Sequence, residues 1–121
     1  MLAVGYATVF WPGFVLFEDY IFRASPPVDV VRSWEERCEG DRGAVERVMN
    51  HWHLADIQYY GCPDITRERI VYLGRVLKEI HEAKLRWQFP DRPCEVVLGE
   101  PEDPEDLEAY EISFWQKKHA L

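Results

Sequence analysis

Two histidines and an aspartate lie close together near the middle of the chain, and they are residue types that bind metals. The segment reads His51-Trp52-His53, and Asp56 follows three residues later. Imidazole nitrogens and carboxylate oxygens are common ligands of zinc and iron. A metal-dependent hydrolase that uses His51, His53 and Asp56 is therefore one hypothesis for the function.

The spacing of the two histidines argues against a shared metal ion. A helix is predicted from about Arg42 through Trp52, because apolar residues recur there at helical spacing: Val45, Val48, Met49 and Trp52. Side chains two residues apart on a helix point about 200° from each other, so His51 and His53 would not face one ion. We therefore predict no metal and no cofactor. We expect one of the histidines, with Asn50, to bond backbone or a carboxylate where this helix ends.

The sequence contains no pattern of a nucleophilic or phosphate-binding enzyme. It has no G-x-S-x-G elbow, no cysteine at a recognised distance from a histidine, and no glycine-rich phosphate loop. Its three cysteines, Cys38, Cys62 and Cys94, have no C-x-x-C spacing. They are typical of reduced thiols in a cytoplasmic protein rather than of disulfides or a zinc site. We predict that the protein is not an enzyme.

A strongly acidic loop lies near the end of the chain, and we call residues Gly99–Glu108 the acidic loop. It has no cation and six carboxylates: Glu100, Glu102, Asp103, Glu105, Asp106 and Glu108. Repulsion between like charges favours an open, solvated loop, which its two prolines stiffen. The negative potential of such a loop reaches about 8 Å at physiological salt, and this suits a partner with a basic surface. The alternative is a connection that only adds solubility.

The overall charge and composition narrow the class of partner. The chain has 22 acidic and 14 basic residues and a net charge of −8, which opposes nucleic acid and anionic membranes. The same charge permits fast association with a basic protein. With 121 residues and 47% apolar residues, the chain is expected to form a single domain, 1–121, around one core.

Two strands are predicted at the N-terminus, Val4–Phe10 and Phe14–Phe22, joined by a turn at Trp11-Pro12-Gly13. The apolar stretch that contains them lacks a positively charged start and is shorter than the roughly 20 residues of a membrane span. We therefore expect core strands in a cytoplasmic protein that does not enter a membrane. Glu18-Asp19 interrupts the second strand, either as a structural pair with Arg23 or helix ends, or as part of a site.

Helices are predicted between the N-terminal strands and the last third of the chain. The first spans Val28–Cys38, and the second is the helix from Arg42 described above. The third begins at a cap formed by Asp64 or Thr66 and ends at Phe89-Pro90. Its apolar stripe is marked by residues at helical spacing: Ile70, Leu73, Leu77, Ile80, Lys84 and Trp87.

A hairpin of two alternating strands, near Cys94–Leu98 and Tyr110–Trp115, is predicted to close the chain. The resulting order β-β-α-α-α-β-β indicates an α+β fold, in which the N-terminal strand pair and the C-terminal hairpin form an antiparallel sheet packed on about three helices. Trp115 lies on the face opposite Tyr110, Ile112 and Phe114. It is a candidate aromatic contact for a partner if that face is uncovered, and a core residue if it is covered.

Four segments of the chain resemble small bacterial immunity proteins of polymorphic-toxin and contact-dependent inhibition systems: Trp11–Arg23, Met49–Ile57, Ala83–Pro93 and Tyr110–Gln116. The resemblance implies a cytosolic inhibitor that binds a cognate toxin domain and has no turnover of its own. The predicted partner-binding residues are the six carboxylates of the acidic loop together with Trp115. A self-associating structural subunit is a further alternative.

Overall fold

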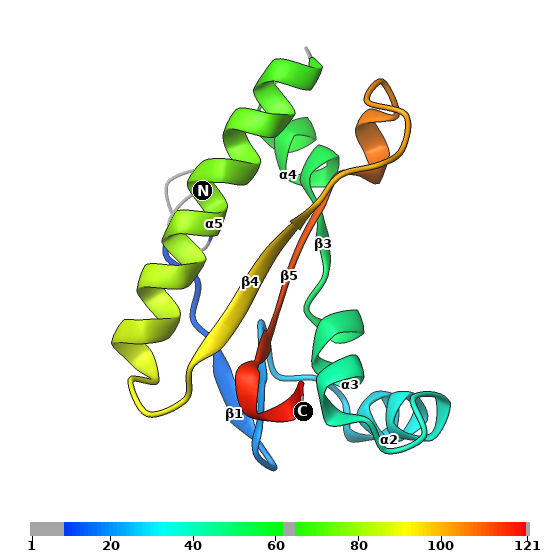
Figure 1. Ribbon diagram of the computed structural model, residues 1–121, viewed down its shortest axis with the longest axis vertical. Coiled ribbons are helices and arrows are strands. Elements are labelled where there is room, and N and C mark those ends of the chain that lie inside the picture. The colour runs from blue at the N-terminus through cyan, green and yellow to red at the C-terminus, as the bar shows by residue number, and fades with distance from the viewer. Residues whose placement is uncertain (1–8, 62–64, 121) are drawn as a thin grey trace.

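The computed structural model describes residues 9–61 and 65–120. They form an α+β fold in which antiparallel strands pack against helices (Figure 1). The predicted fold class is confirmed. The differences from the predicted elements lie in the N-terminal strand pair and around His51–His53.

The N-terminal strand pair is a tight hairpin that lies further along the chain than predicted. Strand β1 (Val15–Phe17) pairs with β2 (Tyr20–Phe22), so the turn is Glu18-Asp19 and not Trp11-Pro12-Gly13. Both turn residues have positive φ, 48° and 72°, as in a type I′ hairpin turn. The predicted strand Phe14–Phe22 is thus two strands. Of the predicted strand Val4–Phe10, only residues 9 and 10 are described, and they are helical.

Helices α2 (Val28–Arg37) and α3 (Arg42–Met49) follow the hairpin and begin where the sequence predicts. The Asp41 side chain accepts a hydrogen bond from the Ala44 N–H at 3.1 Å and caps the start of α3. Helix α3 ends three residues earlier than predicted, because Asn50 forms its C-cap.

Residues Trp52–His53 form a short strand, β3, so the prediction of a helix through Trp52 is wrong. The side chain of Asn50 explains the change of direction. Its Nδ2 donates to the carbonyl oxygens of Ile21 and Phe114, and its Oδ1 accepts from the Arg23 N–H. These three bonds to distant segments turn the chain out of the helix. Helix α4 (Leu54–Gly61) then begins directly after β3.

The long helix α5 (Arg67–Gln88) is capped by Thr66, whose hydroxyl accepts a hydrogen bond from the Arg69 N–H at 3.2 Å. Its start, its end and much of its apolar stripe agree with the prediction. The buried face is rotated, however, because it contains Gly74 and His81, whereas Trp87 is 71% exposed. A Cβ atom at Gly74 would lie 2.7 Å from Leu98, so the absence of a side chain allows α5 to approach the sheet closely.

Strands β4 (Cys94–Gly99) and β5 (Glu111–Gln116) form the predicted C-terminal hairpin. Strand β5 is the middle strand of a three-stranded antiparallel sheet with the order β3-β5-β4. The acidic loop and a short 3-10 helix, η1 (Leu107–Ala109), connect the two hairpin strands. Helix α5 runs along the hairpin, and the acidic loop projects from the end that is remote from β1 (Figure 1). A second 3-10 helix, η2 (Lys117–His119), follows β5.

Two groups of buried apolar side chains form the core. The larger group lies between α5 and the sheet and includes Ile70, Leu77, Ile112 and Phe114. The smaller group joins β2 to α2 and α3 through Tyr20, Phe22, Val31 and Val45. The N-terminal hairpin forms its own two-stranded sheet and joins the two groups, because Ile21 on β2 belongs to the larger one.

A buried carboxylate connects the hairpin to the sheet. Glu46 on α3 is completely buried and accepts hydrogen bonds from the Ile21 N–H at 2.8 Å and the Gln116 N–H at 2.9 Å. The Gln116 side-chain amide donates a third bond at 2.8 Å. These bonds satisfy the buried carboxylate and fix β2 against the end of β5. Within the described ranges, no helix combines the length and the apolar character that a membrane crossing requires.

Candidate functional site

The acidic loop has a defined backbone conformation. The Glu105 N–H donates to the Asp103 side chain at 3.0 Å, and the Asp106 N–H donates to the Asp103 carbonyl at 3.0 Å. The buried Tyr110 hydroxyl donates to the Pro104 carbonyl at 2.9 Å, and Leu107 packs against the larger core group. The loop is therefore solvated, as predicted, but held by its own backbone rather than open.

All six carboxylates of the acidic loop are exposed, and none forms a salt bridge within the parts of the chain that the structure describes. The nearby cation Arg67 lies at the start of α5. A hydrogen bond with the Tyr110 side chain, with smaller contributions from the charges of Glu100 and Glu105, raises the pKa of Arg67. The six carboxylates of the loop are therefore available to interact with solvent or with a partner.

Trp115 does not lie beside the acidic loop. The loop leads into the Glu111 end of β5, whereas Trp115 is near the other end, roughly 13 Å along the strand at 3.3 Å per residue. Its ring is half-buried, and the Arg47 guanidinium lies 5.0 Å from the ring centroid. Trp115 is therefore partly covered by α3. This burial is intermediate between the two predicted alternatives, an uncovered contact residue and a core residue. The structure brings the six carboxylates together but separates them from the predicted aromatic contact.

Two tryptophans that are more exposed than Trp115 lie elsewhere. Trp87 is 71% exposed and Trp11 is 49% exposed, with 6.1 Å between their ring centroids. The Lys84 ammonium lies 5.0 Å from the Trp87 centroid and 5.6 Å from that of Trp11. The helical stripe predicts Trp87 in the core, so this exposed pair was not predicted from the sequence. The rotation of the buried face toward Gly74 and His81 explains the error.

His51 and His53 face the same side of the chain because β3 is a strand. The two imidazole rings lie edge to face with 5.3 Å between their centroids. Glu111 on β5 pairs with His53, and the three side chains form a group whose potential ligand atoms lie within 4.8 Å of one another. The prediction that His51 and His53 point away from each other is therefore wrong. The group contains Glu111 in the place that the sequence analysis gave to Asp56, which is exposed on α4.

The sequence indicates that Glu111 lies on a strand, but it does not indicate that this strand pairs with the segment of the two histidines. Its place in the alternating segment Tyr110–Trp115 indicated the polar face of a strand. Its proximity to the histidines depends on the pairing of β3 with β5. The prediction that a histidine and Asn50 bond backbone at the end of the second helix is confirmed, since His51 Nδ1 lies 2.5 Å from the Val48 carbonyl oxygen.

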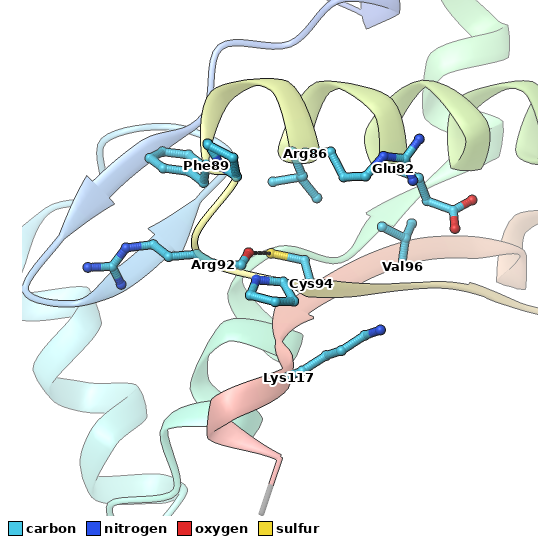
Figure 2. A pocket seen from close by; sticks show the side chains of 10 residues that line it. Glu82, Arg86, Phe89, Arg92, Cys94, Val96 and Lys117 are labelled. Atoms are coloured by element: carbon cyan, nitrogen blue, oxygen red, sulfur yellow. Dashed lines mark hydrogen bonds between the residues drawn. The ribbon is translucent and has the colours of Figure 1, made fainter.

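A pocket of about 280 Å³ lies between the end of α5 and β4 (Figure 2). Cys94 is the thiol that lines it, and burial raises the pKa of this thiol to about 12. Its S–H donates to the Arg92 carbonyl at 3.3 Å, and the Arg92 guanidinium extends away from the pocket (Figure 2). A protonated thiol is a poor nucleophile, so the pocket has the chemistry of a packing gap rather than of a thiol active site.

Glu18 and Asp19 have structural partners. Glu18 forms a salt bridge with Arg32 at 2.6 Å, and Asp19 forms salt bridges with Arg92 at 2.6 Å and Lys118 at 2.7 Å. The hydrogen bonds from Lys118 and Arg92 hold the pKa of Asp19 well below its usual range. The structural alternative is therefore supported, although the partners are not Arg23.

No protein family, curated protein or solved structure matches this chain.

Proposed function

We propose that this protein is a non-enzymatic binding protein of the immunity type, which binds and neutralises a cognate bacterial toxin domain through the acidic loop. The observation that supports this proposal is the loop itself, with six exposed carboxylates on a hydrogen-bonded backbone. Exposed charge of one sign attracts an oppositely charged partner over distance. A backbone that is already ordered loses less entropy when it binds.

The partner is expected to carry a basic surface, such as the phosphate-binding groove of a nuclease toxin. Trp115 is a second contact in this proposal. Because it lies roughly 13 Å along β5 from the loop, only a partner of domain size can touch both. The Arg47 side chain, stacked on the Trp115 ring, is a cation at that second contact, so the attraction is expected to come from the acidic loop.

The test is a capture experiment with three versions of the tagged protein and a lysate of the native bacterium. The loop variant carries four isosteric neutral substitutions: Glu102→Gln, Asp103→Asn, Glu105→Gln and Asp106→Asn. The matched control neutralises four exposed carboxylates elsewhere: Glu36→Gln, Glu79→Gln, Asp91→Asn and Glu95→Gln. Each variant changes the net charge from −8 to −4, so the two differ only in where the charge is lost.

The wild type and the control are expected to capture the same basic protein, which is released as salt rises, and the loop variant is expected to lose it. At low salt the association rate of the loop variant should fall roughly tenfold or more. The captured protein should arrest growth when expressed alone, and co-expression of the wild type should restore growth. Equal capture by the loop variant, or a captured protein with no toxicity, would count against the proposal.

A further inference from the structure

We propose that His51, His53 and Glu111 form a binding site for a divalent transition metal ion such as Zn²⁺. His51 directly precedes β3 and His53 lies in it, and the two imidazoles are on the same side of the chain, with 5.3 Å between their centroids. Glu111, the first residue of β5, is the direct antiparallel partner of His53. One potential ligand atom from each residue lies within 4.8 Å of the other two.

Hydrogen bonds to backbone hold both imidazoles in the state that a metal needs. His51 Nδ1 lies 2.5 Å from the Val48 carbonyl oxygen, and His53 Nδ1 lies 3.0 Å from the Glu108 carbonyl oxygen. A carbonyl oxygen only accepts hydrogen bonds, so Nδ1 carries the proton in each ring. In the neutral ring, Nε2 then presents its lone pair. Metal-binding histidines usually have this arrangement, with the second ring nitrogen bonded to a carbonyl or carboxylate.

A bound ion requires the three ligand atoms to lie closer together than they do in the structure. Zinc bonds of roughly 2.0–2.1 Å in a tetrahedron place ligand atoms about 3.4 Å apart, so atoms that now lie up to 4.8 Å apart must approach by up to about 1.4 Å. His51 is exposed and Glu111 is half-buried. Both line a hollow of about 370 Å³ with Arg47, so they have room to rotate. The Arg47 guanidinium is engaged with the Trp115 ring at 5.0 Å from its centroid.

The ligand set determines which class of ion binds. Two imidazoles and one carboxylate suit Zn²⁺ and its neighbours in the first transition row, whereas Mg²⁺ and Ca²⁺ prefer oxygen ligands throughout. Three protein ligands leave a fourth tetrahedral position for water or a ligand from another molecule. The inference is independent of the proposed toxin partner, because none of the three ligands is a carboxylate of the acidic loop.

The test is a calorimetric titration of Zn²⁺ into the full chain, without a histidine tag and after removal of bound metal with a chelator. One ion per chain is expected, with no measurable heat from Mg²⁺ at the same concentration. His51→Ala and Glu111→Gln should each weaken Zn²⁺ binding at least roughly tenfold. The matched control is Asp56→Asn, which changes an exposed carboxylate near the histidines and should leave the affinity unchanged.

Nitrogen NMR of the wild-type imidazoles makes the test independent of how the variants fold. Zn²⁺ should shift the Nε2 signals of His51 and His53 and leave that of the buried His81 unchanged. The inference is overturned if Zn²⁺ does not saturate at one ion per chain or if the imidazole signals do not move. It is also overturned if Asp56→Asn, rather than His51→Ala and Glu111→Gln, weakens binding.

Discussion

The guanidinium of Arg23 donates a hydrogen bond to Nε2 of His81, with 2.5 Å between the two nitrogens. His81 is completely buried on α5, and its Nδ1 lies 2.7 Å from the Leu77 carbonyl oxygen. The carbonyl only accepts, so Nδ1 carries the proton and Nε2 accepts from Arg23. Burial, reinforced by the positive charge of Arg23, lowers the pKa of His81 to about 4. The folded protein therefore holds this imidazole in its neutral form.

This arrangement makes stability depend on pH between about 4 and 6.5. As pH falls below 6.5, the unfolded chain binds a proton at His81 and the folded chain does not, so unfolding becomes more favourable. The full effect is about 3 kcal/mol at pH 4. We expect urea unfolding at stepped pH to show this loss in the wild type and not in His81→Gln, which accepts from Arg23 without titrating. Parallel free-energy curves for the two proteins would refute the assignment.

Removal of the buried carboxylate of Glu46 should strongly destabilise the fold. Glu46→Ala leaves the N–H groups of Ile21 and Gln116 without their acceptor in a buried site. An unsatisfied buried donor costs about 1–3 kcal/mol, so we expect a loss of at least about 3 kcal/mol in the free energy of unfolding. Glu36→Ala, at an exposed position of α2, is the matched control and should change stability by less than about 0.5 kcal/mol. Equal melting temperatures for the two variants would contradict the role given to Glu46.

Gly43 should not tolerate a side chain. A Cβ atom at this position on α3 would lie 2.7 Å from the backbone carbonyl oxygen of His119, which cannot rotate away. We expect Gly43→Ala to destabilise the protein by about 1–3 kcal/mol and to disturb η2. Gly13→Ala is the control, because nothing lies within 4 Å of a Cβ atom there. Thermal unfolding of both variants checks the prediction, and a neutral Gly43→Ala would show that η2 moves at little cost.

The Tyr110 hydroxyl should be the main anchor of the acidic loop. Tyr110→Phe removes the hydrogen bond to the Pro104 carbonyl and the one with Arg67, and it leaves the charge of the loop unchanged. We expect a loss of about 1 kcal/mol in stability and faster amide hydrogen exchange in the segment 103–107. Tyr72→Phe, at a side chain that is 72% exposed, should change neither. Unchanged exchange in Tyr110→Phe would mean that the backbone bonds to Asp103 are sufficient to order the loop.

The ion pairs of Asp19 should stabilise the hairpin turn only modestly. Asp19→Asn keeps a residue type that tolerates the positive φ of 72° but removes the salt bridges to Arg92 and Lys118. Because Asp19 is about half exposed, we expect a loss of less than about 1 kcal/mol that shrinks with added salt. Folding lowers the pKa of Asp19, so the wild type keeps the stability from these ion pairs above pH 3.8 and loses it as the pH falls below that value. An equal loss at low and high salt would indicate a packing effect instead.

Local periodicity is enough to predict several elements of this fold. The cap of α5 at Thr66, its end at Phe89, and the alternating strands β4 and β5 are where the sequence predicts. The acidic loop was also predicted correctly as an exposed segment, because the charge of a run of carboxylates between two strands is enough to keep it in solvent. These features follow from the geometry and solvation of one short segment at a time.

Contacts between distant parts of the chain set the N-terminal turn, the end of α3 and the group of candidate metal ligands. Glu18-Asp19 lacks the glycine or asparagine of a usual tight turn, and distant partners, Arg32, Arg92 and Lys118, hold its charges. Asn50 ends α3 through bonds to Ile21 and Phe114, and the chain then forms the strand Trp52–His53 instead of continuing as a helix. Glu111 then reaches the histidines through strand register across 58 residues of sequence. Contacts between such distant residues depend on how the whole chain packs, which the periodicity of a single segment does not specify.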